Sequence, residues 1–167
     1  MMERVSKTVS RAKPSRYFED FSLGERYIIP SRTQTSGLFA MFQAASGDND
    51  PIHYDREFCR ARGYPDMLAH GMQVLIQTAA GAGDFPGEVS DSLMGMLEVS
   101  GKFLSPVCCG DTLYPELEIT ELTEQTSTGV VGMRATVHNQ NDEMVFEGTH
   151  RYLIRKRQAP EGVSDGG

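Results

Sequence analysis

The chain has 167 residues and a mass of 18.5 kDa, enough for one domain whose core needs no disulfide or structural metal. Hydrophobic residues make up 39% of it, and no apolar run approaches the roughly 20 residues that span a bilayer, so we expect a soluble globular protein that binds no membrane. The net charge of −7 argues against nucleic-acid binding, because nucleic-acid-binding proteins usually present a basic face.

The charge changes sign along the chain. Residues 1–16 hold one acid, Glu3, and five basic residues, Arg4, Lys7, Arg11, Lys13 and Arg16. This stretch lacks the apolar segment of a secretory signal. It has the acid-poor, Arg-bearing and Ser-bearing character of an organelle transit peptide, but we interpret it as a flexible basic tail. Residues 158–167 are polar and contain glycine, which predicts a disordered tail and leaves residues 17–157 as the folded domain.

The cysteine pattern indicates reduced thiols. Cys59, Cys108 and Cys109 form an odd set, and the adjacent pair is poorly placed to bridge itself. Neither the cysteines nor the histidines have the spacing of a zinc site. We therefore expect a cytoplasmic protein that binds no metal.

The first half of the chain predicts short elements joined by turns. Residues 26–29 are typical of a short strand, which Pro30 ends. Residues 36–46 place apolar side chains at helical spacing and predict an amphipathic helix. This helix ends where Gly47 can adopt the left-handed conformation, and Pro51 prevents it from resuming, so residues 46–53 form a rigid turn. A shorter helix over residues 57–62 follows.

A more apolar helix comes next. Met72, Leu75, Ile76, Ala79 and Ala80 share one helical face, and other faces are also apolar or small. We therefore expect a long, largely buried helix that ends in residues 81–83.

The second half of the chain alternates apolar and polar residues, as strands do. The alternation predicts strands over residues 97–103, 113–120, 131–138 and 144–154, the last two forming a hairpin. A largely apolar helix followed by antiparallel strands predicts an α+β fold in which the sheet curls around the helix. Such a sheet leaves one edge strand exposed, so we expect a homodimer or higher homo-oligomer that pairs edge to edge.

The densest group of polar residues is Ser46-Gly47-Asp48-Asn49-Asp50-Pro51-Ile52-His53. It holds the carboxylate of Asp48 and the imidazole of His53 on the rigid turn, which orients an acid–base pair before any reaction begins. Asp and Asn are also common in turns as caps and turn formers. The local pattern alone therefore leaves a structural and a catalytic role open.

This motif closely resembles the hydratase motif Gly-Asp-x-Asn-Pro-x-His of the MaoC-like dehydratases, the (R)-specific enoyl-CoA hydratase family. Two later segments resemble the same family in the same order: Ala69-His70-Gly71-Met72, and Phe103-Leu104-Ser105-Pro106-Val107 with Gly110-Asp111-Thr112-Leu113. The three matches cover roughly residues 17–155. The resemblance implies a single hotdog fold, an antiparallel sheet curled around a long central helix, which agrees with the fold that periodicity predicts.

The resemblance also implies the site residues. Asp48 and His53 match the family's catalytic pair, which would hold one water, act as the base and return the proton on the same face. The family's asparagine before the proline is Asp50 here, which adds a negative charge beside the pair. We expect Asp50 and Ser46 to support the substrate site. The backbone N–H of Gly71 is the candidate donor to the enolate oxygen.

The neighbouring polar residues have two interpretations each. We place His70 in the expected substrate-binding region. For its role, a helix cap or an interior histidine is favoured over a second catalytic base. Arg56, Arg60 and Arg62 are candidates for contacts with the phosphates of CoA, and a solvated helix face explains them equally well.

We therefore expect (R)-specific hydration of trans-2-enoyl-CoA to 3-hydroxyacyl-CoA, or the reverse dehydration, with an acyl-CoA thioester as substrate and no cofactor. Two alternatives stay open: a thioesterase on the same fold, and a non-catalytic acyl-CoA-binding subunit in which Asp50 marks lost activity. We expect His138 and His150 at the surface and assign neither a role.

Overall fold

The computed structural model describes residues 14–157, so most of the two predicted tails, residues 1–13 and 158–167, lie outside the described residues. The last residues of the basic stretch belong to the folded part. Ser15 is buried, and the Arg16 guanidinium forms ion pairs with Glu25 and Glu88. The described part therefore includes three residues, 14–16, that composition assigns to the tail.

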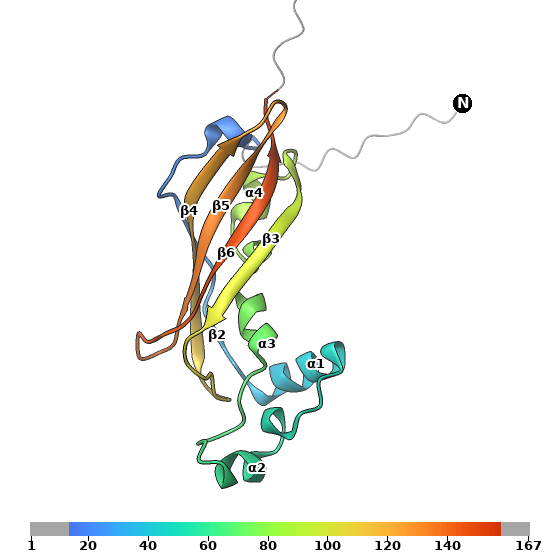
Figure 1. The fold of residues 1–167 in the computed structure, drawn as a ribbon, viewed down its shortest axis with the longest axis vertical. Helices are drawn as coiled ribbons and strands as arrows, with labels where there is room; N and C mark the ends of the chain where they lie inside the picture. The colour runs from blue at the N-terminus through green and yellow to red at the C-terminus, as the bar shows by residue number, and fades with distance from the viewer. Residues whose placement is uncertain (1–13, 158–167) are drawn as a thin grey trace, which may run out of the picture.

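One antiparallel sheet forms the body of the molecule (Figure 1). Its strands run in the spatial order β1-β4-β5-β6-β3, and the short β2 pairs with β4. The strands are β1 (Arg26–Ile28), β2 (Arg32–Thr33), β3 (Leu93–Phe103), β4 (Thr112–Glu124), β5 (Thr128–His138) and β6 (Met144–Arg155). The predicted strands and the predicted hairpin between β5 and β6 are thus confirmed, and the fold is α+β.

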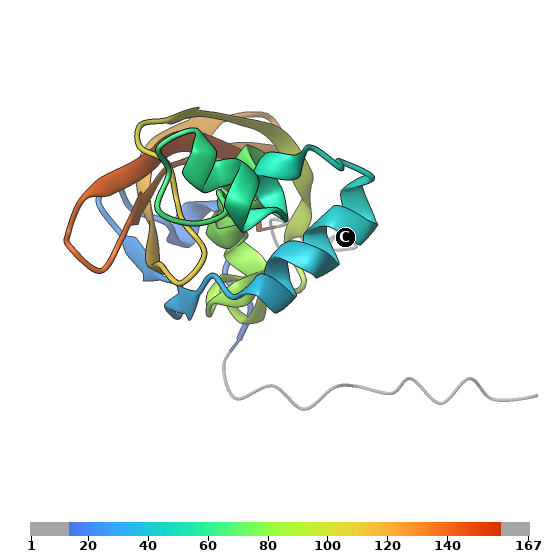
Figure 2. The ribbon, with the colours of Figure 1, turned by 90° about the horizontal axis from the view of Figure 1, so that it is seen from below.

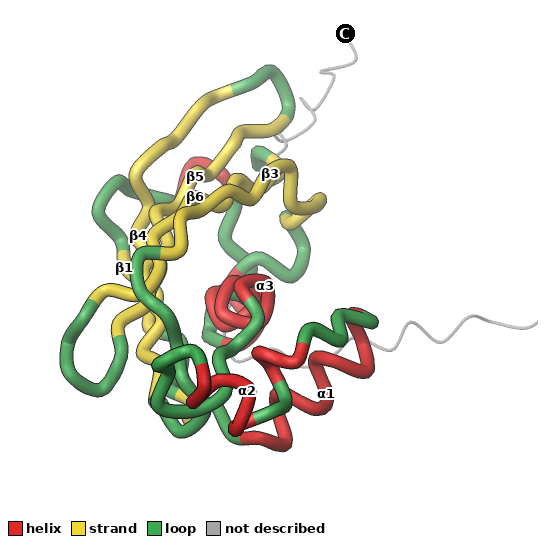
Figure 3. The backbone as a smooth tube through the Cα atoms, turned by 60° about the horizontal axis from the view of Figure 1, so that its bottom comes forward, coloured by secondary structure: helices red, strands yellow, loops and turns green. Residues whose placement is uncertain are grey.

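The helices occupy two places (Figures 1 and 3). One helical segment lies in the curve of the sheet, and α1 and α2 lie together at one end of the molecule, which Figure 2 shows from below. The helices are α1 (Ser36–Ser46), α2 (Arg56–Ala61), α3 (Gly71–Leu75) and α4 (Phe85–Glu88), with 3-10 turns η1 (Phe18–Asp20), η2 (Pro51–His53), η3 (Ile76–Thr78) and η4 (Ala80–Ala82). None of the described helices is long and apolar enough to cross a membrane.

The core lies on the concave face of the sheet. Alternate side chains of β4 and β5 point into it, and Leu117, Ile119, Val131, Met133 and Ala135 are all fully buried. The alternation seen in the sequence therefore identifies the core face of these strands correctly, because successive side chains of a strand point to opposite faces.

The long central helix is where the prediction was wrong. The α-helix stops at Leu75, tightens into the 3-10 turn η3, and breaks at Ala79, whose backbone has ψ 114°. The hydroxyl of Thr78 donates to the carbonyl of Leu75 at 2.7 Å and contacts His150 Nε2 at 2.9 Å. A Thr hydroxyl that bonds the preceding turn competes with helical hydrogen bonding, which explains the break.

The buried face of this segment is also not the predicted one. Met72 and Ile76, expected inside, are 62% and 53% exposed. The polar residues Gln73 and Thr78 are buried instead, because each has a hydrogen-bond partner inside the sheet's curve. An apolar face that the sheet does not cover is thus left open to solvent.

Strand β3 is also open to solvent. Among the described strands it pairs with β6 alone, so its other edge forms no backbone hydrogen bonds with a further strand. Leu97 and Val99 are 55% and 42% exposed, although their alternation with polar residues is typical of a half-buried strand.

His150 corrects another expectation. The sequence predicts it at the surface, but it is buried, with Thr78 on one ring nitrogen and the Tyr152 hydroxyl 3.1 Å from the other. Burial lowers the pKa of His150 and raises the pKa of Tyr152 to about 12. Both groups are therefore neutral at neutral pH.

Candidate active site

The polar turn begins at the end of α1, where its geometry is fixed by local hydrogen bonds. Thr35 caps the start of α1, accepting a hydrogen bond from the backbone N–H of Leu38 at 3.3 Å. At the other end Gly47 has φ 74°, and its N–H donates to Gln43 at 2.9 Å. A side chain is strained at this positive φ, so glycine suits the position and lets the chain leave the helix directly into Asp48.

Three side chains then shape the turn. The Ser46 hydroxyl accepts from the N–H of Asp48 at 3.2 Å, and Asp48 Oδ1 accepts from the N–H of Asp50 at 3.2 Å. Asp50 Oδ1 in turn accepts from the N–H of Ile52 at 3.0 Å, which caps η2. Ser46 and Asp50, both predicted to support the site, therefore act here through the backbone that carries Asp48 and His53.

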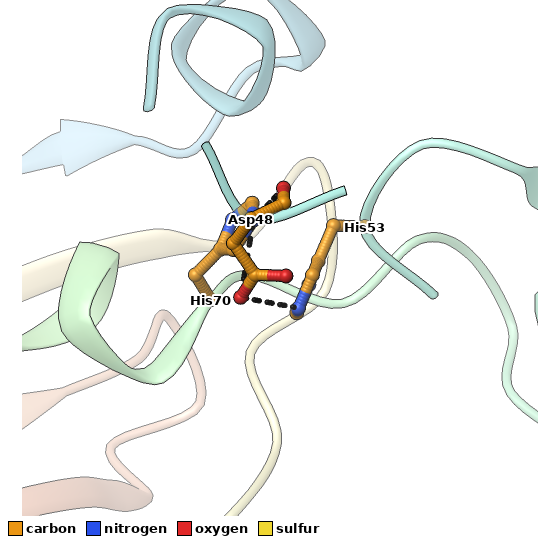
Figure 4. Close-up of side chains that lie close together, drawn as sticks. All are labelled: Asp48, His53 and His70. Carbon is orange, nitrogen blue, oxygen red and sulfur yellow. Dashed lines mark hydrogen bonds and ion pairs between the residues drawn. The ribbon is translucent and has the colours of Figure 1, made fainter. Parts of the chain in front are cut away.

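Asp48 and His53 face each other across a short gap (Figure 4). His53 Nε2 lies 3.8 Å from Asp48 Oδ2, which is too long for a direct hydrogen bond and suits one bridging water. The side chain of His53 is 13% exposed and that of Asp48 is 52% exposed, so solvent reaches the pair. The structure thus brings together the two residues that the motif predicted as catalytic.

The other ring nitrogen of His53 fixes its tautomer. His53 Nδ1 lies 2.7 Å from the backbone carbonyl of Leu68. A carbonyl oxygen only accepts hydrogen bonds, so Nδ1 carries a proton, and in the neutral ring Nε2 presents its lone pair toward Asp48. His53 is therefore oriented as a base.

His70 completes the cluster from the residue before α3. Its ring stacks on that of His53, with centroids 3.6 Å apart and planes 21° apart. His70 Nε2 lies 3.2 Å from the backbone carbonyl of Asp48 and 3.9 Å from Asp48 Oδ2. His70 occupies the N-cap position of α3, but its side chain makes no capping hydrogen bond. Of the two roles expected for it, the structure supports the buried interior histidine.

Asp48, His53 and His70 place their potential ligand atoms within 4.8 Å of one another, which raises the question of a metal. A metal bound by all three would need the lone pair of His70 Nε2. That nitrogen faces the Asp48 carbonyl at 3.2 Å, where it can only donate. The donor set therefore suits an acid–base cluster better than a metal centre.

Gly71 begins α3 beside the end of β3. A Cβ at this position would lie 3.1 Å from the ring of Phe103, so the close approach of this ring favours glycine. Backbone N–H groups in the first turn of a helix have no acceptor within the helix. Gly71 therefore lies at the start of the helix, directly after His70.

The three arginines predicted as phosphate contacts each have a partner within the chain. Arg56 Nε pairs with Asp66 at 2.8 Å, and Arg60 pairs with Glu57 at 2.5 Å. Arg62 lies over the ring of Phe58, 3.4 Å from its centroid. None of these contacts brings the three guanidinium groups together.

A hollow of about 270 Å³ connects one arginine with the site. It is lined by Ser36, Gln43, His53, Tyr54, Arg56 and Met67, among others. A larger cavity of about 640 Å³ lies elsewhere, between the ends of β5 and β6 and residue Tyr17, and none of the predicted site residues lines it. Position therefore favours the smaller hollow as part of the site.

Two buried glutamines next to His70 were missed by sequence reasoning. Gln73 Oε1 lies 3.4 Å from His70 Nδ1, and Gln73 Nε2 donates to Gln34 Oε1 at 3.1 Å. Both glutamines are fully buried. A signal was present, because buried polar side chains need hydrogen-bond partners and Gln73 interrupts an otherwise apolar segment.

Comparison with known proteins identifies the fold and the family. The sequence model of one protein family, the MaoC-like domain, matches residues 20–141. Mesaconyl-CoA hydratase of Cereibacter sphaeroides is 30% identical over 152 residues, which are 88% of this chain and 43% of that protein. The chain thus spans less than half of that relative.

Two further proteins are similar over most of this chain. The 3-hydroxybutyryl-CoA dehydratase of Methylorubrum extorquens is 26% identical, over 89% of this chain and 90% of its own length. A double-hotdog protein from Mycobacterium tuberculosis superposes with a TM-score of 0.76 at 24% identity, covering 89% of this chain and 47% of that one. The fold of the chain is a hotdog, and its curated relatives include hydratases and dehydratases of CoA thioesters. The chain belongs to the family of proteins with a MaoC-like domain.

Proposed function

We propose that the protein adds water to a trans-2-enoyl-CoA to give an (R)-3-hydroxyacyl-CoA, or catalyses the reverse dehydration. The observation that carries this proposal is the 3.8 Å gap between His53 Nε2 and Asp48 Oδ2. One water fits between two groups at this distance, hydrogen-bonded to both. The names of the relatives, a hydratase and a dehydratase acting on CoA thioesters, support the same reaction class.

The chemistry follows from the tautomer of His53. The water oxygen attacks the β-carbon while one of its protons passes to His53 Nε2, whose lone pair faces the gap. The electrons of the carbon–carbon double bond move toward the thioester and form an enolate. The α-carbon then takes a proton from the same Asp48–His53 pair, so that the elements of one water are added on one face. Because both transfers are proton transfers, the proposal requires no cofactor.

The enolate oxygen needs a hydrogen-bond donor where its charge develops. The backbone N–H of Gly71 is the donor that we propose, because it lies in the first turn of α3 beside His70. A glycine also lets a thioester approach the backbone closely. The Phe103 ring against Gly71 would then border the thioester.

Among the three arginines, Arg56 is our candidate for a phosphate of CoA, because it lines the same hollow as His53. Its partner Asp66 holds the guanidinium in place. Burial opposes a low pKa for Asp66, but the Met67 N–H and the Arg56 guanidinium hold that pKa below its ordinary value. A phosphate would bind the face of Arg56 that the carboxylate leaves open.

We also propose that the protein works as a homodimer or higher homo-oligomer. The open edge of β3 can continue the sheet of a second copy, and the exposed apolar side chains of Leu97, Val99, Met72 and Ile76 would be covered by it. Burying such side chains stabilises association, whereas an uncovered edge strand favours uncontrolled pairing.

The test is to incubate the protein with crotonyl-CoA and a longer trans-2-enoyl-CoA. The proposal predicts loss of enoyl-thioester absorbance, formation of the (R)-3-hydroxyacyl-CoA on chiral analysis, and no release of free thiol. Thiol release with intact double bonds would instead identify a thioesterase. Binding of acyl-CoA without either product would identify a binding subunit, and both results would contradict the proposal.

A further inference from the structure

The segment that leads into α3 lies between two other parts of the chain. On one edge, the Leu68 N–H donates to the Ile52 carbonyl at 3.0 Å, and the Leu68 carbonyl lies 2.7 Å from His53 Nδ1. On the other edge, the Ala69 N–H donates to the Val107 carbonyl at 2.8 Å. Backbone groups of successive residues in an extended segment point to opposite edges. His53 and the chain that follows β3 therefore flank this segment from opposite sides.

Phe103 contacts the start of α3 from the second of these sides. It is the last residue of β3, which ends beside α3 (Figure 1). Around the position of a Cβ on Gly71, apart from its own helix and its chain neighbours, the three nearest heavy atoms all belong to the Phe103 ring, at 3.1, 3.2 and 3.4 Å. The ring therefore borders the space that a side chain on residue 71 would fill.

A second aromatic ring supports Phe103 from the sheet. Phe103 lies opposite Phe146 on β6, and the two ring centroids are 5.4 Å apart with their planes at 52°. Phe146 is fully buried, and its ring fills the space beside Gly101 and Gly148, where a Cβ on either glycine would overlap it. The Phe103 ring is thus held between Phe146 and the start of α3.

We propose that Phe103 shields the enolate of the hydration reaction from solvent, on the side away from Asp48 and His53. This inference rests on the proposed function, in which the Gly71 N–H holds the enolate oxygen. That oxygen and the α-carbon are bonded to the same carbon and lie about 2.4 Å apart. The α-carbon of a thioester held at Gly71 is therefore close to the ring that contacts Gly71. The apolar ring excludes water from this side of the α-carbon.

The shield determines which face of the α-carbon receives its proton. The α-carbon of an enolate is planar, so a proton can reach it from either face. When the Phe103 ring closes one face, the proton comes from the Asp48–His53 pair on the other, and water is added on one face only. A smaller side chain at residue 103 opens the closed face to solvent, which then donates a proton there. Phe103 thus controls the stereochemistry at the α-carbon.

The test is the hydration of crotonyl-CoA in D₂O by the full chain, stopped at low conversion. The oxygen of D₂O bonds to the β-carbon and keeps one deuteron, the other deuteron bonds to the α-carbon, and the carbon–carbon π bond breaks. The 3-hydroxybutyryl-CoA formed carries one deuterium at the α-carbon, and proton coupling constants distinguish its two diastereomers. We expect a single diastereomer from the wild type, and about a tenth or more of the other from Phe103→Ala.

Two further variants make the result decisive. Leu104→Ala is the matched control, because Leu104 is the next residue and is 49% exposed, against 52% for Phe103. It should give a single diastereomer. Phe103→Leu keeps an apolar side chain against Phe146 and should give a smaller share of the second diastereomer, and it replaces Phe103→Ala if thermal unfolding shows that variant to be unfolded. A single diastereomer from every active Phe103 variant, or an equal mixture from Leu104→Ala, would overturn the inference.

A second thioester separates this inference from the proposed function. Butyryl-CoA has no double bond to hydrate, but its α-protons exchange with D₂O through the same kind of enolate. Hydration by the wild type with a single diastereomer from Phe103→Ala would leave the function standing and contradict the shield. Exchange of one α-proton of butyryl-CoA by the wild type and of both by Phe103→Ala, without any hydration, would do the opposite. No reaction with either thioester would contradict both.

Discussion

The rings of His53 and His70 stack with their centroids 3.6 Å apart, although one comes from η2 and the other precedes α3. The contact joins the polar turn to the helical segment inside the sheet's curve. Ile52 strengthens the same junction, since its carbonyl accepts from the Leu68 N–H at 3.0 Å and from Cys59 Sγ at 3.1 Å. The acid–base pair is therefore positioned by two parts of the fold at once.

The first prediction concerns Asp50, which replaces the asparagine that the MaoC-like motif has before its proline. Its carboxylate caps η2 through the Ile52 N–H, and an asparagine oxygen can accept the same hydrogen bond. Asp50→Asn should therefore keep stability within a few tenths of a kcal/mol, whereas Asp50→Ala should lose about 0.5–2 kcal/mol. Urea unfolding measures both. Equal stability of the two variants would show that the cap contributes nothing.

The second prediction tests Gly71 as the site of close substrate approach. In Gly71→Ala the new methyl would lie 3.1 Å from the Phe103 ring, which is half exposed and can shift. We expect the protein to stay folded and its kcat to fall by about tenfold or more, because the methyl crowds the backbone donor. Gly81→Ala is the matched control, since no atom lies within 4 Å of its Cβ position. Full activity of Gly71→Ala would remove Gly71 from the mechanism.

The third prediction concerns the open edge of β3. Light scattering of the wild type should give at least twice the 18.5 kDa mass of the chain. Val99→Lys places a charge in the apolar row of β3 and should shift the protein toward the monomer, because lysine on an edge strand opposes pairing. Thr120→Lys, also at an exposed strand position but on β4, should leave the mass unchanged. A wild type that is monomeric at micromolar concentration would contradict the proposed assembly.

The fourth prediction is a dependence of stability on pH. Burial lowers the pKa of His150 below its ordinary value of 6.5, so the unfolded state takes up this proton at a higher pH than the folded state. The contribution of His150 is therefore fully present above about pH 6.5 and is lost as the pH falls toward its lower folded-state value. Urea unfolding across this range should show a steeper decline for the wild type than for His150→Gln.

His138→Gln is the control for this experiment, because His138 is only partly buried, at the end of β5. Its slope should match that of the wild type. Identical slopes for the wild type and His150→Gln would show that burial of His150 does not couple folding to this proton.

Local patterns in the sequence predicted much of the fold. Helix α1, with its cap at Thr35 and its left-handed Gly47, follows from short-range rules, and so do the alternating strands β4 and β5. The polar turn after α1 predicts the Asp48–His53 pair, and the geometry of the pair agrees with the motif. These features depend on residues close together in the chain.

What could not be predicted depends on contacts between distant segments. The break after Leu75 requires His150 from β6 to meet Thr78, and the burial of Gln73 requires Gln34. Helical periodicity assigned Met72 and Ile76 to the core, because it reports an apolar face without saying what covers that face. The partners of the arginines are likewise side chains that spacing does not reveal.

The measurement that tests the central claim most directly is the rate of hydration of crotonyl-CoA by the wild type, Asp48→Asn, His53→Gln and the double variant. If the two residues act together on one water, each single variant should lose about 10²- to 10⁴-fold in kcat, and the double variant should be little worse than the poorer single one. Asp48→Asn or His53→Gln within tenfold of an active wild type, or losses that multiply in the double variant, would contradict a shared water between Asp48 and His53.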